Sequence, residues 1–242
     1  MSRCLPVHPV KWDVDGSPFC GTLSGMRKLI GVAVVAAALG LAPRADAQVA
    51  LDLKLGYAIP TGDVMAFGPW RYYGPMTNLY SGAIPIGVGA RWRFSPSLSV
   101  GAYFQYAPAL VASRACASGF SCSGSDTRVG VEAVYAFLPA STWNPWVSLG
   151  TGWEWSTLKV SAGGQSVSQS MNGWEYFNVQ AGLDWNLSRT FAVGPWLGFF
   201  GGSYSNASFT DEAGSTSSGT IDSGLRAFHG WLQFGLKGTV YL

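Results

Sequence analysis

Few side chains in this sequence have the chemistry of a catalytic centre, and the first to consider is His229. It is the only histidine after residue 48, and a histidine beside a serine could act as the base of a hydrolytic or acyl-transfer enzyme. The segment Phe228-His229-Gly230-Trp231 has no serine two residues after the histidine. We therefore expect a histidine at the rim of the fold without a catalytic role, and no enzyme activity.

Two cysteines have a spacing that predicts a disulfide rather than a metal site. Cys116 and Cys122 are separated by five residues, which is not the Cys-x-x-Cys spacing of redox or zinc sites, and no histidine lies near them. In an oxidising exterior such a pair braces a loop. The other two cysteines, Cys4 and Cys20, fall in a segment that we expect to be absent from the mature protein.

Asp211, Glu212 and Asp222 form an acidic group that could bind a divalent cation or simply solvate a loop. Their spacing matches no known cation-binding loop, so solvation is the better prediction. Together with the absence of a cofactor motif, this leads us to expect no cofactor and no metal.

The remaining charged residues follow a pattern with a period of two. Val49, Leu51, Leu53, Leu55 and Tyr57 are apolar, whereas Asp52 and Lys54 occupy the alternate positions. Alternation with this period is typical of a β-strand with one apolar face. Charged residues recur on the non-apolar side of the later segments, so that the predicted inward set is Asp52, Lys54, Arg91, Arg93, Arg128, Glu132, Glu154, Asp184 and Lys237.

Eight such segments can be written between Val49 and Leu242, and their connections alternate in length. Short links follow the second, fourth and sixth segments, for example Ser95 to Ser97. Long links follow the others, at Pro60 to Gly82, Pro108 to Asp126, Thr157 to Gly173 and Gly202 to Ala227. This arrangement predicts an all-β fold: an eight-stranded antiparallel up-and-down transmembrane β-barrel with turns on one side and loops on the other.

The composition agrees with strands that face lipid. Only 12% of the residues are charged, whereas soluble domains carry about 25%. Aromatic residues gather where segments meet turns or loops, as the interfaces of a bilayer would select. A soluble lipocalin-like binder is the alternative; it should have apolar residues inside and a far more charged surface.

The first 47 residues read as a targeting region. Residues 26–47 combine a basic start, a short apolar run and an Ala-x-Ala ending, which predicts a cleaved signal peptide and export through the Sec pathway. Residues 1–25 are interpreted as a mis-assigned or disordered extension, and residues 48–242 as the barrel domain. From Gln48 onward ten basic residues balance ten acidic ones, so no nucleic-acid partner is expected.

Three stretches carry a family resemblance: Leu53 to Asp63, Asn144 to Gly152, and the closing segment Phe234 to Leu242. They resemble the small outer-membrane β-barrel proteins of the OmpX and OmpA-barrel type. The resemblance implies location in the bacterial outer membrane, contact with lipid and lipopolysaccharide, and a last strand that is read by the barrel-assembly machinery. In that family the last residue is usually Phe, whereas this chain ends in Leu242.

The function predicted from these observations is a monomeric, non-enzymatic outer-membrane barrel with four exposed loops and a structural, envelope-integrity or surface-interaction role. In a barrel of this size the inward charges should pair with one another and with Gln105, Gln180 and Gln233 to form a polar plug. Two alternatives remain open: a narrow channel for small solutes or ions lined by those charges, and a lipid-modifying enzyme.

Overall fold

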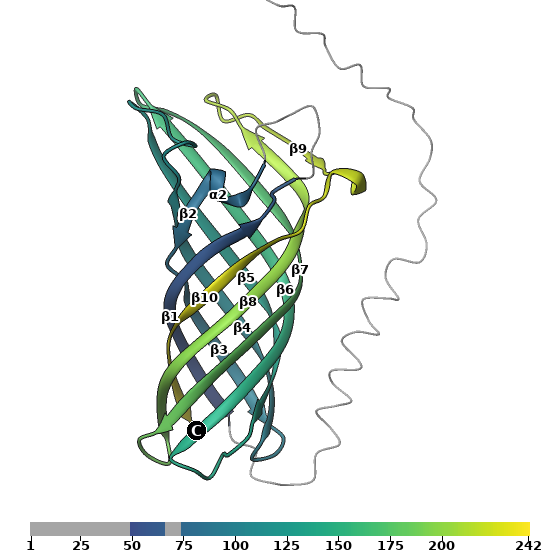
Figure 1. Cartoon of the computed structure of the whole chain (residues 1–242). Coiled ribbons are helices and arrows are strands. Elements are labelled where there is room, and N and C mark those ends of the chain that lie inside the picture. The colour runs from purple at the N-terminus through teal and green to yellow at the C-terminus, as the bar shows by residue number, and fades with distance from the viewer. Residues whose placement is uncertain (1–48, 66–73) are drawn as a thin grey trace, which may run out of the picture. The chain divides into compact units, whose positions relative to one another are not determined.

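The computed structural model describes residues 49–65 and 74–242, and its strands close into a ring of eight. Closure is complete because the first strand, β1 (Val49–Gly62), pairs with the last, β10 (His229–Tyr241), from Ala50 opposite Tyr241 to Gly62 opposite His229. Figure 1 shows the tilted strands winding around a common axis. The predicted eight-stranded barrel is thus confirmed, and its closed ring leaves no long unpaired edge in the bilayer.

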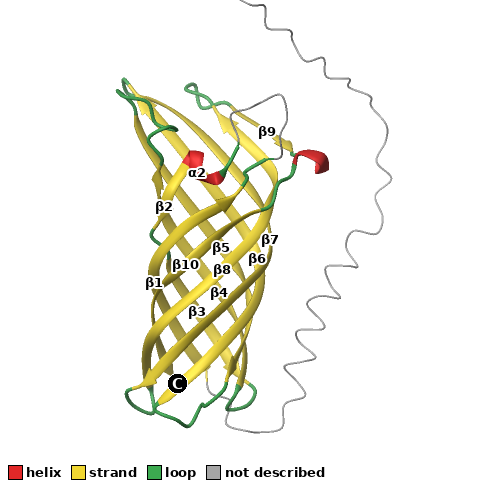
Figure 2. Cartoon of the chain, viewed as in Figure 1, coloured by secondary structure: helices red, strands yellow, loops and turns green. Residues whose placement is uncertain are grey.

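The other elements follow one another up and down around the ring. They are α2 (Met76–Leu79), β2 (Tyr80–Ala83), β3 (Ile86–Arg93), β4 (Leu98–Val111), β5 (Ser121–Ala136), β6 (Trp143–Ala162), β7 (Gln165–Asn186), β8 (Phe191–Thr210), β9 (Thr216–Thr220) and a 3-10 turn at Ser223–Leu225. β2 and β3 together occupy one place in the ring, since both pair with β1 and β4, and β9 adds a short strand to β8. No helix among the described residues is long and apolar enough to cross a membrane (Figure 2).

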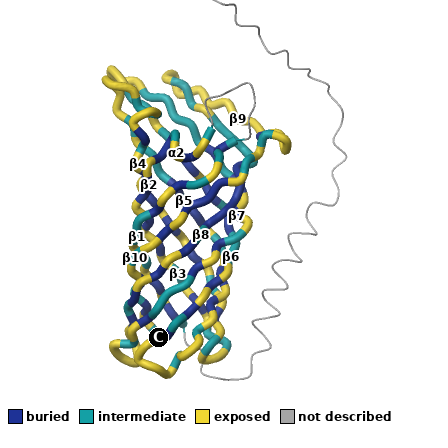
Figure 3. Tube along the Cα trace, in the orientation of Figure 1, coloured by how far each residue is buried: buried dark blue, intermediate teal, exposed yellow. Residues whose placement is uncertain are grey.

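Side chains alternate between the wall and the interior along each strand. Leu53, Val88 and Leu236 are exposed on the outer wall, whereas Asp52, Gly87 and Lys237 are buried. Figure 3 shows buried and exposed residues taking turns along the strands. The apolar set predicted from the sequence therefore faces outward, and this wall can only be stable against hydrocarbon.

Strands extend further at the loop end than the sequence pattern indicated. The predicted long loop from Thr157 to Gly173 is wrong, because β6 and β7 continue to Ala162 and from Gln165. A tight turn joins them at Gly163 and Gly164, which adopt positive φ angles of 59° and 86°. Beyond the lipid both faces of a strand can be polar, so the alternation that reveals a membrane strand disappears there.

The other predicted loops are shortened in the same way. β4 continues to Val111 and β5 begins at Ser121, within the predicted second loop, and β8 continues to Thr210 within the fourth. The second predicted strand is interrupted at Ile84 and Pro85, between β2 and β3. The signal peptide at 26–47 and the extension at 1–25 lie outside the described residues and stay predictions.

Placing a charge on the outer wall tests the orientation of the strands. We expect Val88→Arg to lower the free energy of unfolding by about 2 to 4 kcal/mol, because the guanidinium would lie in hydrocarbon. Ser218→Arg, on β9 beyond the lipid-facing wall, should change stability little. Urea unfolding in lipid vesicles measures both. Equal effects of the two substitutions would contradict the assigned faces.

Candidate functional site

The barrel interior is the candidate site, because the charged residues predicted from the sequence converge there. Of the predicted set, Lys54 and Arg93 are partly exposed, and the rest are buried: Asp52, Arg91, Arg128, Glu132, Glu154, Asp184 and Lys237. They fall into three layers along the axis, which we call the turn-end, middle and loop-end layers. The middle and loop-end layers join strands that are far apart in the ring, whereas the ion pairs and hydrogen bonds of the turn-end layer join adjacent or next-but-one strands.

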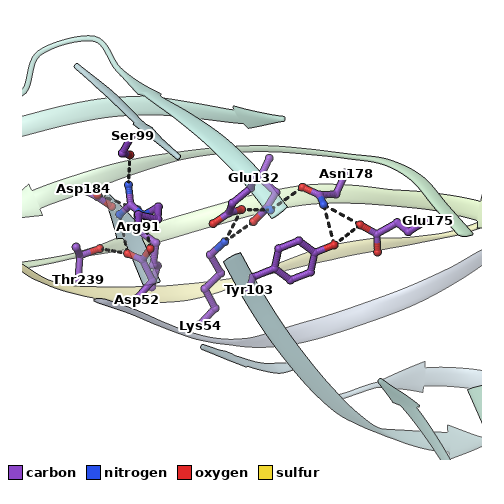
Figure 4. Close-up of polar contacts among 12 residues, drawn as sticks. Asp52, Lys54, Arg91, Ser99, Tyr103, Glu132, Glu175, Asn178, Asp184 and Thr239 are labelled. Carbon is purple, nitrogen blue, oxygen red and sulfur yellow. Dashed lines mark hydrogen bonds and ion pairs between the residues drawn. The ribbon is translucent and has the colours of Figure 1, made fainter. Parts of the chain in front are cut away.

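The turn-end layer contains two ion pairs. Arg91 on β3 binds both carboxylate oxygens of Asp52 on β1, and its third nitrogen donates to the Ser99 hydroxyl at 2.9 Å. The Thr239 hydroxyl also donates to Asp52, at 2.7 Å. Figure 4 shows this cluster between β-strands of the wall. This bidentate ion pair neutralises the charge of Arg91 and fixes the orientation of its guanidinium.

Lys237 and Asp184 form the second pair of this layer. The Lys237 Nζ lies 2.9 Å from an Asp184 oxygen, and the indole N–H of Trp146 donates to the other oxygen at 2.9 Å. The ammonium also lies 3.8 Å from the centroid of the Trp146 ring, so a cation–π contact adds to the ion pair. Both oxygens of Asp184 are thereby engaged.

The middle layer is a chain of hydrogen bonds across the lumen. Lys54 on β1 donates to the Gln180 side chain on β7 at 2.7 Å and lies 3.5 Å from Glu132 on β5. The Gln180 amide donates in turn to Glu132 at 3.0 Å and to Asn178 at 3.1 Å. Because the donors and acceptors come from three strands, the chain links opposite sides of the wall (Figure 4).

Tyr103 connects the middle layer to the loop-end layer. Its hydroxyl donates to Glu175 and accepts from the Asn178 amide at 3.0 Å. The ring packs on inward glycines: a Cβ added to Gly130 or Gly152 would lie only 2.6 Å from the Tyr103 oxygen. These glycines are therefore needed to let a large side chain cross a narrow barrel.

The loop-end layer gathers three carboxylates around one guanidinium. Arg128 lies 2.9 Å from Asp126, 3.0 Å from Glu154 and 3.7 Å from Glu175, and all four side chains are buried. Glu154 also accepts from the Tyr204 hydroxyl at 3.0 Å and from the Trp231 indole at 3.3 Å. Hydrogen bonds thus help Arg128 to stabilise the excess of carboxylates.

His229 is part of this layer, so its predicted place at the rim is wrong. Its side chain is only 1% exposed, and its Nε2 lies 3.0 Å from a Glu154 oxygen. The ring stacks on Tyr204 with 4.0 Å between centroids. His229 and Trp231 are two residues apart on β10, so their side chains point to the same, inward side of the strand. This orientation buries His229. In the described part of the chain no serine hydroxyl is hydrogen-bonded to this ring.

Two members of the loop-end layer were missed from the sequence. Asp126 was assigned to a loop, although it lies two residues before Arg128 and shares its parity. Glu175 would face outward by simple alternation, but a shift of register between Glu175 and Phe177 turns it inward. Extending the predicted strand of Arg128 toward its N-terminus would have placed Asp126 in the interior. The alternation of the sequence carries no signal for the inward position of Glu175.

An apolar cluster fills the lumen above the loop-end layer. α2 lies at this mouth (Figure 1) and contributes Met76, which is fully buried with Tyr80 and next to Trp231. The cluster also contains Val64, Leu79, Tyr204 and Ile221. We call this group the apolar cap. It forms because Val64, two residues after β1, and Met76 and Leu79 of α2 pack together with side chains of the wall.

The other candidates from the sequence have simple structural settings. Cys116, in the connection after β4, and Cys122, at the start of β5, form a disulfide with 5.9 Å between their Cα atoms. Asp211 accepts backbone N–H groups of Ala213 and Ser215, at 3.0 and 2.8 Å, and so stabilises a hairpin turn. No group of His, Cys, Asp or Glu within residues 49–65 and 74–242 has the arrangement of a metal site.

Comparison with known proteins supports the fold. No family model matches the chain, and no curated protein matches it in sequence. Among solved structures, a major outer membrane protein from Thermus thermophilus is 12% identical, with a TM-score of 0.53 over 80% of this chain and 99% of that one. This likeness shows the fold of an outer-membrane β-barrel.

More distant similarities extend to barrels with different roles. The attachment invasion locus protein Ail of Yersinia pestis is 13% identical, covers 80% of this chain and 99% of its own, and gives a TM-score of 0.41. The outer membrane protease OmpT of Escherichia coli is 7% identical over 81% and 97%, also with a TM-score of 0.41. The resemblance to small outer-membrane barrels is confirmed at the level of fold, and these neighbours select no activity for this chain.

Breaking one ion pair tests how much the interior depends on pairing. We expect Lys237→Met to lower the free energy of unfolding by about 3 to 5 kcal/mol, because Asp184 is left charged and buried. Adding Asp184→Leu should recover part of this loss, but not all, since the Trp146 N–H then lacks its acceptor. Arg114→Met, which removes an exposed hydrogen bond to Asn78, is the control and should cost little.

Urea unfolding of the wild type, Lys237→Met, Asp184→Leu, the double variant and the control in the same vesicles gives the coupling between Lys237 and Asp184. A double variant that is no more stable than Lys237→Met, or a single variant as stable as the control, would contradict the importance of this pair.

Proposed function

We propose that this protein is a monomeric, integral outer-membrane barrel with a closed lumen, which acts as a structural scaffold and presents its extended hairpins at the cell surface. The observation that carries the proposal is the filling of the interior. Ion pairs and hydrogen bonds occupy the lumen in three layers, two of which cross it, and the apolar cap lies above them. A void beside Lys54 and Tyr103 measures about 10 Å³, barely enough for one water.

The extended strands support the role in surface presentation. A membrane strand needs roughly ten residues, whereas β6 and β7 contain 20 and 22. The surplus forms hairpins at the loop end, rich in serine, threonine and glycine, and the disulfide constrains the connection of β4 to β5. Stiff hairpins of this kind hold a surface in a defined shape, which favours contact with lipopolysaccharide or another cell-surface partner.

The orientation follows from the same proposal. In outer-membrane barrels the short turns face the periplasm and the long connections face outside. The turn end is then periplasmic, and β10, the strand that closes the ring on β1, is the one we propose for contact with the barrel-assembly machinery. The lipid-facing wall supplies the contact with outer-membrane lipid.

Planar-bilayer recording separates the closed scaffold from the narrow channel. We expect no discrete conductance steps, because the charged groups of the lumen are bonded to one another rather than to mobile ions. A porin inserted under the same conditions is the positive control. Discrete steps whose ion selectivity changes in Arg128→Gln would contradict the closed lumen, since Arg128 is buried in the loop-end layer and a contaminating porin would not respond.

Lipid analysis separates the scaffold from a lipid-modifying enzyme. His229→Gln should leave the composition of lipid A unchanged, because the imidazole is bonded to Glu154 inside the barrel and does not reach lipid. Glutamine keeps a polar group at this position, and the amount of barrel in the membrane fraction controls for folding. A change in lipid A mass at equal protein level would refute the scaffold.

A further inference from the structure

The turn end of the barrel contains a cavity of about 400 Å³, which the function proposed above does not use. The three turns that join β3 to β4, β5 to β6 and β7 to β8 surround it, and β10 completes the wall. Its deeper walls include Arg91, Trp146 and Lys237 of the turn-end layer. A volume of this size lies in the range of pockets that hold small molecules.

Basic side chains dominate the lining. Arg91, Arg93, Arg189 and Lys237 line the cavity, whereas Asp184 is its only acidic lining residue among the described part of the chain. Asp52, which holds Arg91 in place, does not line the cavity. The lining therefore has more basic than acidic residues, and low-dielectric walls concentrate the field of such an excess charge.

The single carboxylate is not available to a cation. One oxygen of Asp184 is bound to Lys237 and the other to the Trp146 indole. Arg91 is held by Asp52 and Ser99, so its position is fixed before any ligand arrives. A pre-positioned guanidinium and a buried ammonium are the groups that recognise phosphate and carboxylate oxygens.

Neutral hydrogen-bonding side chains complete the lining. They include Ser97, Ser99, Ser141, Thr142, Asn144 and Asn186. Hydroxyl and amide groups can donate to an oxyanion that basic residues have attracted. The turns themselves are tied together, since the Asn186 amide donates to the Ser141 carbonyl at 2.6 Å, so the cavity is formed without a ligand.

We propose that this cavity binds a small oxyanion, carrying phosphate or carboxylate groups, that enters from the turn end. The site rests on the geometry of the cavity alone; that its turn-end opening faces the periplasm rests on the function proposed above. If the barrel does not bind anions, the proposal of a closed scaffold still holds. If the barrel conducts ions, the proposal of an anion site still holds.

Titration of inorganic phosphate into the purified full chain tests the site. The protein is kept in a glucoside detergent, because detergents with phosphate headgroups would compete, and sodium chloride holds the ionic strength constant. Calorimetry should show saturable binding of one phosphate per barrel. A linear response without saturation would overturn the proposal.

Two variants and a control locate the binding. Arg189→Gln, in a turn at the rim, should weaken phosphate binding roughly three- to tenfold. Asp184→Asn keeps the shape of the side chain, removes the only acidic lining residue and should strengthen binding. Lys159→Gln removes the same charge at the loop end and should have no effect. Equal weakening by Arg189→Gln and Lys159→Gln would overturn the site, even if Asp184→Asn fails to fold.

Succinate, titrated in competition with phosphate, defines the ligand class. Displacement of phosphate by succinate extends the site to carboxylates, and its absence restricts the site to phosphate. A phosphate signal that chloride abolishes at equal ionic strength would instead overturn recognition of oxyanions.

Discussion

The structure depends on the pairing of charges inside a wall that faces hydrocarbon. Once the outer face of each strand is apolar, every charged side chain on the other face must be neutralised within a narrow lumen, since the interior offers little water. Asp52 with Arg91 and Asp184 with Lys237 meet this need as direct pairs. Arg128 forms ion pairs with three carboxylates, those of Asp126, Glu154 and Glu175.

This pairing also accounts for the details of the wall. Cross-lumen bonds such as that from Lys54 to Gln180 join strands that do not pair in the sheet, so they fix the barrel as a whole rather than one hairpin. Inward glycines allow Tyr103 to lie across the axis. The register shift near Glu175 brings that carboxylate to Arg128, and the apolar cap then seals the lumen where the charges end.

The sequence predicts the barrel well because its strongest signal, alternation with a period of two, comes from the wall itself. Leu53, Val88 and Leu236 face outward as expected, and the predicted inward charges lie in the interior. The alternation is caused by the contact of one strand face with lipid, so it ends where the strands leave the bilayer. The hairpin of β6 and β7 has polar side chains on both faces there, and the sequence pattern therefore predicts a loop instead of strands.

Other features depend on tertiary structure that alternation does not encode. The depth of His229 follows from a strand that begins at this residue, before Leu232, the first apolar residue of the pattern. The inward position of Glu175 needs a bulge, and the burial of Met76 needs α2 to lie at the mouth of the barrel. The turn-end cavity is likewise formed by three separate turns and β10, and its basic residues come from β3, the turn between β7 and β8, and β10.

The outward direction of the apolar face can be measured directly by nuclear Overhauser contacts between lipid acyl protons and protein methyl groups in nanodiscs. The account predicts strong contacts for Leu55, Val88 and Leu236 on the wall, and none for the inward methyl groups of Ala58 and Ala192, which are 1% and 0% exposed. Lipid contacts at Ala58 or Ala192, with none at the leucines, would contradict it.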